Sequence, residues 1–482
     1  MEVRLLIDAD LGTVGRSSRT MEHDPGSNQK GWGTAPRRFL SIWQNTTLRT
    51  RLRHIMHLLS GNAVSLVLGI ASMAITVRAL GPTSYGILAL TISFAQAIER
   101  IISFQSWQPI IRYGAELDGE DNLADFKRLL KFGLMLDIAA SLAAWLLANL
   151  LLLLGIHAFG WDSETILIAQ LYSVVLLFGL AGMPTAVLRL SGRFRAAAYT
   201  QVFAAGVRLM ALAITYIAGG GLLAFTLVWA GTQILSSLST LVVGLFVLRR
   251  QGVHGLLFAP LTGITQRFSG LWRFTWSANL SLTIWSSPQQ LDTLIVGGLS
   301  TPEQAGFYHI AKRISIAVLQ AATQVQAVMY PDLARLWARD AFNELRQAVR
   351  QVEYLLAGIG ICGVAITALI AFPAINLAMG PAFRPAAPLL IVQMVAVVMT
   401  VSGSITRSAL LAMDQQGQVL RIVTASTIIF GVTVLALVPQ IGAMGANLAH
   451  IALAATWLAG LRFAFGRAFR NAAIAHPATT RP

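Results

Sequence analysis

Long apolar stretches separated by short polar loops fill most of the chain between Leu58 and Phe465. A helix of about 20 residues crosses the hydrocarbon core of a bilayer, which is about 30 Å thick. Within that core every backbone polar group needs an internal partner, and the α-helix provides one. The pattern therefore predicts an all-α polytopic membrane protein. We expect about twelve transmembrane helices, at residues 58–80, 85–110, 131–154, 165–188, 201–217, 223–247, 274–297, 305–330, 353–375, 387–412, 419–438 and 444–464.

The composition agrees with this interpretation. Charged residues make up 12% of the chain and hydrophobic residues 55%, and the mean hydropathy is +0.64. An average soluble domain carries about 25% charged residues. The composition therefore excludes an ordinary soluble globular protein.

Positive charge is distributed unevenly over the two sides of the predicted membrane. Of the 36 Lys and Arg residues, 29 fall on the side of the two termini, five lie within predicted helices, and only Arg78 and Arg384 fall on the opposite side. Loops rich in Lys and Arg stay in the cytoplasm. We therefore expect both termini in the cytoplasm, and the net charge of +15 then reflects topology rather than a nucleic-acid partner.

Two loop motifs indicate an internal repeat. Pro82 and Gly86 follow the first predicted helix, and Pro302 and Gly306 repeat their spacing 220 residues later, after the seventh. Six helices per half would make the halves parallel repeats about an axis along the membrane normal. The expected organisation is a cytoplasmic tail at 1–57 that could contain an interfacial helix at 38–57, six-helix lobes at 58–248 and 274–465, a cytoplasmic connector at 249–273 and a cytoplasmic tail at 466–482.

Three segments resemble the motifs of one family. Arg78–Gly86 is similar to the pattern R-x-L-G-P-x-x-Y-G, Asp292–Leu299 to D-x-[LI] followed by two hydrophobic residues and Gly, and Ala305–Ala311 to A-G-x-Y-x-x-A. In these motifs the chain resembles the Wzx-type polysaccharide and O-antigen flippases, the polysaccharide branch of the multidrug/oligosaccharidyl-lipid/polysaccharide exporter superfamily. The resemblance implies two helical lobes around a central cavity and a lipid-linked oligosaccharide as substrate. The long N-terminal tail departs from the family's pattern.

Polar side chains that share one face of a predicted helix are the candidates for a substrate site. An ionisable group within a span normally faces the bundle interior or water, which makes it a functional candidate. Gln96 and Arg100 share a face of the second helix, and Arg313, Gln320 and Gln324 share a face of the eighth. Arginine can donate two parallel hydrogen bonds to a phosphate, and glutamine can bond to sugar hydroxyls. The full candidate set for substrate binding is Gln96, Arg100, Arg208, Lys312, Arg313, Gln320 and Gln324.

Structural roles stay open for the charged candidates. Arg100 could belong to an ion pair between helices, and Lys312 could extend toward the near membrane interface. In the seventh helix Pro288 permits a kink among polar neighbours, which suggests a gating element together with Asp292. Asp292 could instead pair with Lys312 or the arginine beside it. Glu99 is a further candidate for gating or ion coupling.

Several classes of chemistry lack their sequence signals. We find no Walker-type Gly-rich loop, no Cys/His spacing typical of a metal site and no Ser/His/Asp arrangement. The single cysteine, Cys362, excludes an intramolecular disulfide. We therefore expect a transporter rather than an enzyme, with no cofactor and no metal.

The sequence as a whole predicts a flippase. Its expected substrate is a polyprenyl-pyrophosphate-linked oligosaccharide, an O-antigen or exopolysaccharide repeat unit, moved across the bacterial inner membrane by alternating access. The lipid is implied by the resemblance. The alternatives are a multidrug or organic-cation antiporter of the same superfamily, which would need buried carboxylates, and a non-transporting membrane protein of polysaccharide biosynthesis. Expected partners are the lipid-linked substrate, membrane lipids, and a polysaccharide polymerase with its chain-length machinery, but no nucleic acid.

Overall fold

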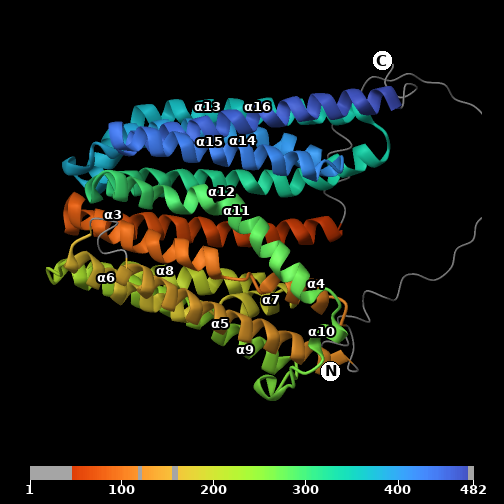
Figure 1. Ribbon diagram of the computed structural model, residues 1–482, viewed down its shortest axis with the longest axis horizontal. Coiled ribbons are helices and arrows are strands. Elements are labelled where there is room, and N and C mark those ends of the chain that lie inside the picture. Colours follow the sequence, from red (N-terminus) through yellow and green to blue (C-terminus); the bar gives the residue numbers. More distant parts are fainter. Residues whose placement is uncertain (1–45, 118–121, 155–160, 476–482) are drawn as a thin grey trace, which may run out of the picture. The chain divides into compact units, whose positions relative to one another are not determined.

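The computed structural model describes residues 46–117, 122–154 and 161–475. Residues 56–482 form one compact unit. The arrangement below concerns this unit alone, which includes α3 from Met56 onward. Its helices, shown in Figure 1, are α3 (Thr46–Ile102), α4 (Trp107–Gly114), α5 (Leu123–Leu154), α6 (Ser163–Ser173), α7 (Gly182–Leu190), α8 (Phe194–Ile217), α9 (Leu222–Arg250), α10 (Ile264–Arg267), α11 (Leu271–Leu299), α12 (Pro302–Ala338), α13 (Phe342–Met379), α14 (Ala386–Ala412), α15 (Gln416–Ile441) and α16 (Ala443–Ala475).

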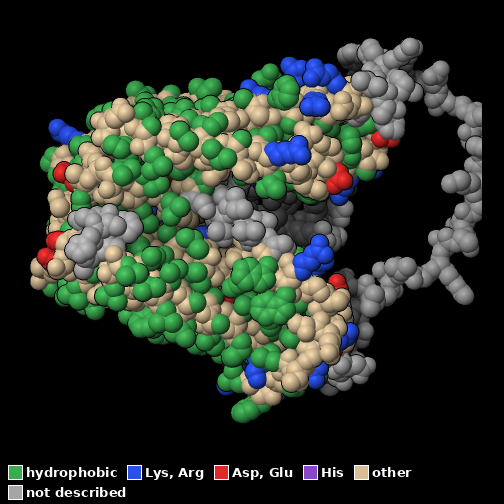
Figure 2. Space-filling view, in the orientation of Figure 1, with side chains coloured by type: hydrophobic (Ala, Val, Ile, Leu, Met, Phe, Trp, Pro, Cys, Tyr) green, Lys and Arg blue, Asp and Glu red, His purple; other side chains and the backbone are tan. Residues whose placement is uncertain are grey.

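The prediction of an all-α membrane protein is confirmed. Nine helical segments among the described residues are long and apolar enough to cross a membrane. One of these, in α3, contains two passes, because Gly81 interrupts the helix with a φ of 70°. Helices α11 and α12 also have spanning length, at 29 and 37 residues, and they contain the charged candidates of the C-terminal half. Figure 2 shows hydrophobic side chains over the outer surface, as contact with lipid requires.

Two predicted spans are interrupted. The second was expected to continue to residue 110, but α3 ends at Ile102 and α4 begins at Trp107. The fourth span consists of α6, a 3₁₀ turn and α7. The interruptions meet in space, because a Cβ added to Gly182 at the start of α7 would lie 2.0 Å from the hydroxyl of Ser106.

Asp137 of α5 stabilises this meeting point. Its carboxylate is 6% exposed, and its Oδ2 accepts the backbone N–H of Met183 at 2.9 Å. The first N–H groups of a helix have no partner within the helix, so Asp137 supplies one to α7 from another helix.

Asp137→Ala should therefore lower the free energy of unfolding by about 1–2 kcal/mol, the usual loss for a helix cap. Thermal unfolding in detergent measures the change. Asp137→Asn keeps an acceptor oxygen and is the control, for which we expect a smaller loss. Equal losses in both variants would show that the carboxylate charge, rather than the cap, matters here.

The helices form two lobes. In the C-terminal lobe α12, α13, α14, α15 and α16 pack against one another. The N-terminal lobe contains α4 to α9. Helix α11 contacts both lobes, through α4 on one side and through α12 and α15 on the other. In Figure 1 the lobes lie close together at the left and diverge toward the right. The segment expected as a connector packs against the N-terminal lobe, where Leu256, Ile264 and Phe268 join the same core as Ile110 and Leu129.

The two loop motifs of the predicted repeat are in contact at the end where the lobes lie close together. A Cβ added to Gly86 would lie 1.8 Å from the carbonyl oxygen of Pro302, and one added to Gly306 would lie 3.1 Å from the Cα of Gly86. Next to them Tyr85 and His309 form a 2.9 Å hydrogen bond between lobes. Only glycine permits this approach, so the motifs hold one end of the molecule shut.

Candidate functional site

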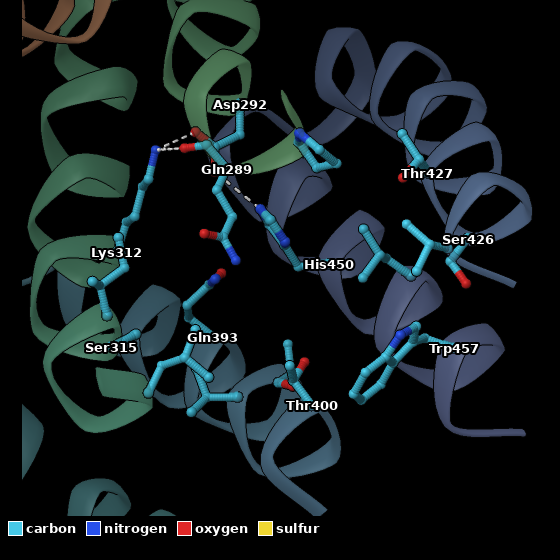
Figure 3. Close-up of a pocket in the computed structure, with 17 residues that line it drawn as sticks. Gln289, Asp292, Lys312, Ser315, Gln393, Thr400, Ser426, Thr427, His450 and Trp457 are labelled. Atoms are coloured by element: carbon cyan, nitrogen blue, oxygen red, sulfur yellow. Dashed lines mark hydrogen bonds and ion pairs between the residues drawn. The ribbon is translucent and has the colours of Figure 1, made fainter. Parts of the chain in front are cut away.

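The carboxylate of Asp292 is the centre of a buried polar cluster in the C-terminal lobe. Asp292 lies on α11 and is 1% exposed. The Nζ of Lys312, on α12, lies 2.5 Å from its Oδ1. The hydroxyl of Tyr308 donates to Oδ2 at 2.8 Å, and Nε2 of His450, on α16, lies 3.0 Å from the same oxygen. Three helices are thus joined through one carboxylate (Figure 3).

Asp292 also binds its own helix. The backbone N–H of Thr293 lies 2.6 Å from Oδ1, although in a regular helix this N–H bonds to the carbonyl of Gln289. Lys312 donates to that carbonyl. A carboxylate offers about four acceptor positions, so Asp292 is saturated with donors. A buried charge needs this degree of pairing to be tolerated.

A cavity of about 80 Å³ adjoins the cluster, inside the C-terminal lobe. Pro288, Lys312, His450 and Trp457 line it together with Gln393. Figure 3 shows the side chains of Lys312, Gln393, His450 and Trp457 arranged around it. The Oε1 of Gln393 is buried and accepts no hydrogen bond from the described protein groups. The space is sufficient for several water molecules.

The second group of candidates lies between the lobes. Arg313 of α12 is exposed, and it has no hydrogen bond or ion pair with any residue whose side chain the structure describes. Its charge acts on Tyr172 of α6 and on Arg208 of α8, both in the N-terminal lobe. The carboxylate of Glu99, next to Arg100 on α3, acts on the same tyrosine. Arg208 and Arg313, predicted from different halves, are therefore near enough for their charges to influence each other.

Arg208 has neutral partners. Its Nε donates to the hydroxyl of Thr232 at 2.9 Å and its Nη2 to Oε1 of Gln233 at 3.1 Å, and its guanidinium lies 4.7 Å from the ring centre of Trp229. Within the described part of the chain no carboxylate lies within ion-pair distance of it. Its position is fixed by α9 while its charge stays uncompensated.

The other predicted site residues lie in different surroundings. Gln96 and Gln320 are exposed on α3 and α12, and the side chain of Gln324 lies outside the described residues. Lys312 does not extend to a membrane interface, because its side chain is 11% exposed and paired with Asp292. Pro288 lines the cavity within a continuous α11.

Sequence reasoning left three residues out of its site candidates: His450 and Tyr308 of the buried cluster, and Gln393 beside it. Tyr308 entered only as the tyrosine of a family motif. His450 and Gln393 are polar residues within predicted spans, which is the signal that identified the other candidates. No group of three or more His, Cys, Asp or Glu side chains converges as a metal site would require among the residues described.

Comparison with known proteins identifies the family. The sequence model of a family described as "Polysaccharide biosynthesis protein" matches residues 75–388. The chain belongs to this family. The inner membrane protein YghQ of Escherichia coli (strain K12) is 27% identical over 339 residues, which cover 69% of this chain and 93% of YghQ.

Solved structures share the fold of this family member. An inward-facing multidrug-resistance MATE transporter of the MOP superfamily aligns over 88% of this chain and 99% of its own, with a TM-score of 0.67 and 15% identity. The lipid II flippase MurJ, in an inward closed conformation, aligns over 86% of this chain and 90% of its own, with a TM-score of 0.65 and 14% identity. The expected two-lobe transporter fold is thereby confirmed.

Proposed function

We propose that this protein is a flippase for a polyprenyl-pyrophosphate-linked oligosaccharide, an O-antigen or exopolysaccharide repeat unit, in the bacterial inner membrane. Membership of a polysaccharide biosynthesis family and a fold shared with a lipid II flippase support this choice. The observation that supports it most directly is the pair of arginines, Arg208 and Arg313. They come from opposite lobes, their charges influence each other, and neither has an ion pair with a described carboxylate.

The chemistry of the substrate explains the arrangement. A pyrophosphate and many hydroxyls cannot enter hydrocarbon unpaired without a large penalty. Guanidinium groups bind phosphate oxygens through parallel hydrogen bonds, and the exposed Gln96 and Gln320 would bond to sugar hydroxyls. The polyprenyl tail would stay in the bilayer.

Alternating access would complete the cycle. The lobes are shut at the end where Gly86 meets Gly306 and diverge at the other end. Relatives with this fold have been solved in inward-facing and outward-facing conformations. We infer that rocking of the lobes separates the glycines, opens the shut end and delivers the substrate to the opposite leaflet, where a polysaccharide polymerase would receive it.

An organic-cation antiporter with the same fold is the second candidate. Such a carrier needs a buried carboxylate available to its substrate. The buried carboxylates of the described residues are Asp137, Asp292 and Glu353. Asp137 caps a helix, and the other two are paired with cations at 2.5 and 2.6 Å. The carboxylate of Glu99 acts on the same tyrosine as Arg208 and Arg313, so it is the one left to a cationic substrate. The two arginines outnumber it, and the charges of this region therefore favour an anionic substrate.

Arg313→Ala and Arg208→Ala should each abolish complementation of a flippase-null strain at normal membrane levels. Lys at either position should restore function only in part, because an ammonium keeps the charge and loses the paired donors. Arg339→Ala, at an exposed position at the end of α12, is the matched control and should complement fully. Normal complementation by both alanine variants would exclude these arginines as the anion site.

A further inference from the structure

A second charged hollow lies on the C-terminal lobe, far from the interface between lobes. Helices α13, α14 and α16 enclose a groove of about 560 Å³. In Figure 1 α13 and α16 lie on the side of the C-terminal lobe that faces away from the N-terminal lobe. The arginines that line the groove are Arg346, Arg350, Arg462 and Arg470.

One of these arginines is neutralised at the base of the groove. Glu353 of α13 is 7% exposed, and Nη2 of Arg462 lies 2.6 Å from its Oε1. The hydroxyl of Thr406, on α14, contacts the other carboxylate oxygen at 3.4 Å. This ion pair fixes α16 against α13 and leaves the charges of the other three arginines uncompensated.

Aromatic rings hold two of the remaining guanidinium groups. Arg346 lies 5.2 Å from the ring centre of Phe469, and Arg350 lies 5.9 Å from that of Tyr354. Neither of them, nor Arg470, has a carboxylate within 4 Å in the described part of the chain. A guanidinium stacked on a ring still presents its N–H edge, so the groove offers several donors to one anion.

The groove also has an apolar side. Phe463 and Tyr354 line it and are 69% and 63% exposed, and Leu355 and Ile359 continue an exposed apolar face along α13. Gly466 lines the groove, and no atom lies within 4 Å of the position its Cβ would take. A ligand that fills this space has an anionic head beside the arginines and apolar chains along α13.

We propose that this groove binds an anionic glycerophospholipid, through its phosphodiester, at the arginine-rich end of the C-terminal lobe. A free phosphate could use the arginines but would leave the apolar face unused. In the orientation expected from the distribution of Lys and Arg, the lipid belongs to the inner leaflet, where basic residues attract anionic headgroups. The bound lipid is distinct from the transported substrate, because the groove faces away from the region between the lobes.

Lipid binding to the purified full-length protein tests the proposal. In native mass spectrometry or in titrations with fluorescent lipid, phosphatidylglycerol should bind at least about tenfold more tightly than phosphatidylcholine. Arg346→Ala combined with Arg350→Ala should remove this preference. Gly466→Leu keeps every charge and favours the helix, yet fills the groove, so it should also weaken phosphatidylglycerol binding by about tenfold.

The N-terminal lobe offers a matched control. Arg250, at the end of α9, is exposed and lies 4.5 Å from the ring centre of Phe246, which is the same arginine–aromatic contact away from the groove. Arg249→Ala combined with Arg250→Ala should leave lipid preference unchanged. Equal loss in this control, or wild-type binding by Gly466→Leu, would overturn the proposal. Competition by inorganic phosphate at concentrations equal to those of the lipid would reassign the groove to a free anion.

Discussion

Asp292→Asn should lower the free energy of unfolding by about 3–5 kcal/mol, the usual loss when one member of a buried ion pair is removed. The variant leaves the ammonium of Lys312 inside the lobe without its 2.5 Å partner. It also weakens the link that Asp292 makes between α11, α12 and α16. Thermal or denaturant unfolding in detergent measures the change.

A double variant distinguishes the loss caused by an unpaired charge from the loss caused by poorer packing. Asp292→Asn combined with Lys312→Met removes both charges and should recover most of the lost stability, since a buried pair often contributes little beyond a neutral replacement. The pair Asp332–Arg335, also on α12, is 60–70% exposed, so Asp332→Asn should change stability by less than about 1 kcal/mol. An Asp292→Asn variant as stable as Asp332→Asn would contradict the role assigned to the cluster.

Gly86→Leu should abolish transport while the protein still inserts into the membrane. The Cβ alone would lie 1.8 Å from the Pro302 carbonyl. This carbonyl belongs to the backbone, so it cannot move aside as the end of a flexible side chain could. In the variant the lobes must therefore separate at this end. A carrier that cannot close one end cannot switch between its two open conformations. Complementation of a flippase-null strain is the functional measurement.

Thiol labelling reports the conformation directly. Cys362 is the single cysteine, so Cys362→Ser gives a background in which Ser84→Cys, beside the glycine contact, is the only target. Gly86→Leu should label faster with a membrane-impermeant reagent than its parent. Gly69→Leu, on the first pass of α3 with no atom within 4 Å of its Cβ position, should transport and label normally. Unchanged labelling of Gly86→Leu would show that the contact does not shut this end.

Much of the fold could be predicted from the sequence because the bilayer imposes a simple rule. Backbone groups in hydrocarbon must pair within the helix, so apolar length alone locates the spans. The same reasoning gave pairing with Lys312 or its neighbour as the alternative to a gating role for Asp292, and it noted the motifs around Gly86 and Gly306. Each of these inferences used only local spacing or the cost of an intramembrane charge.

The tertiary structure decided which helices those residues meet. Periodicity places Lys312 and Arg313 on a helix, but the packing of α11 and α16 directs Lys312 to Asp292 and leaves Arg313 exposed. His450 lies 158 positions from Asp292, a separation that no local pattern can bridge. The contact between Gly86 and Gly306 also joins residues that are far apart in the chain, 220 positions in this case. A helical face is set by neighbours along the chain, whereas its partner is set by the packing of all the helices together.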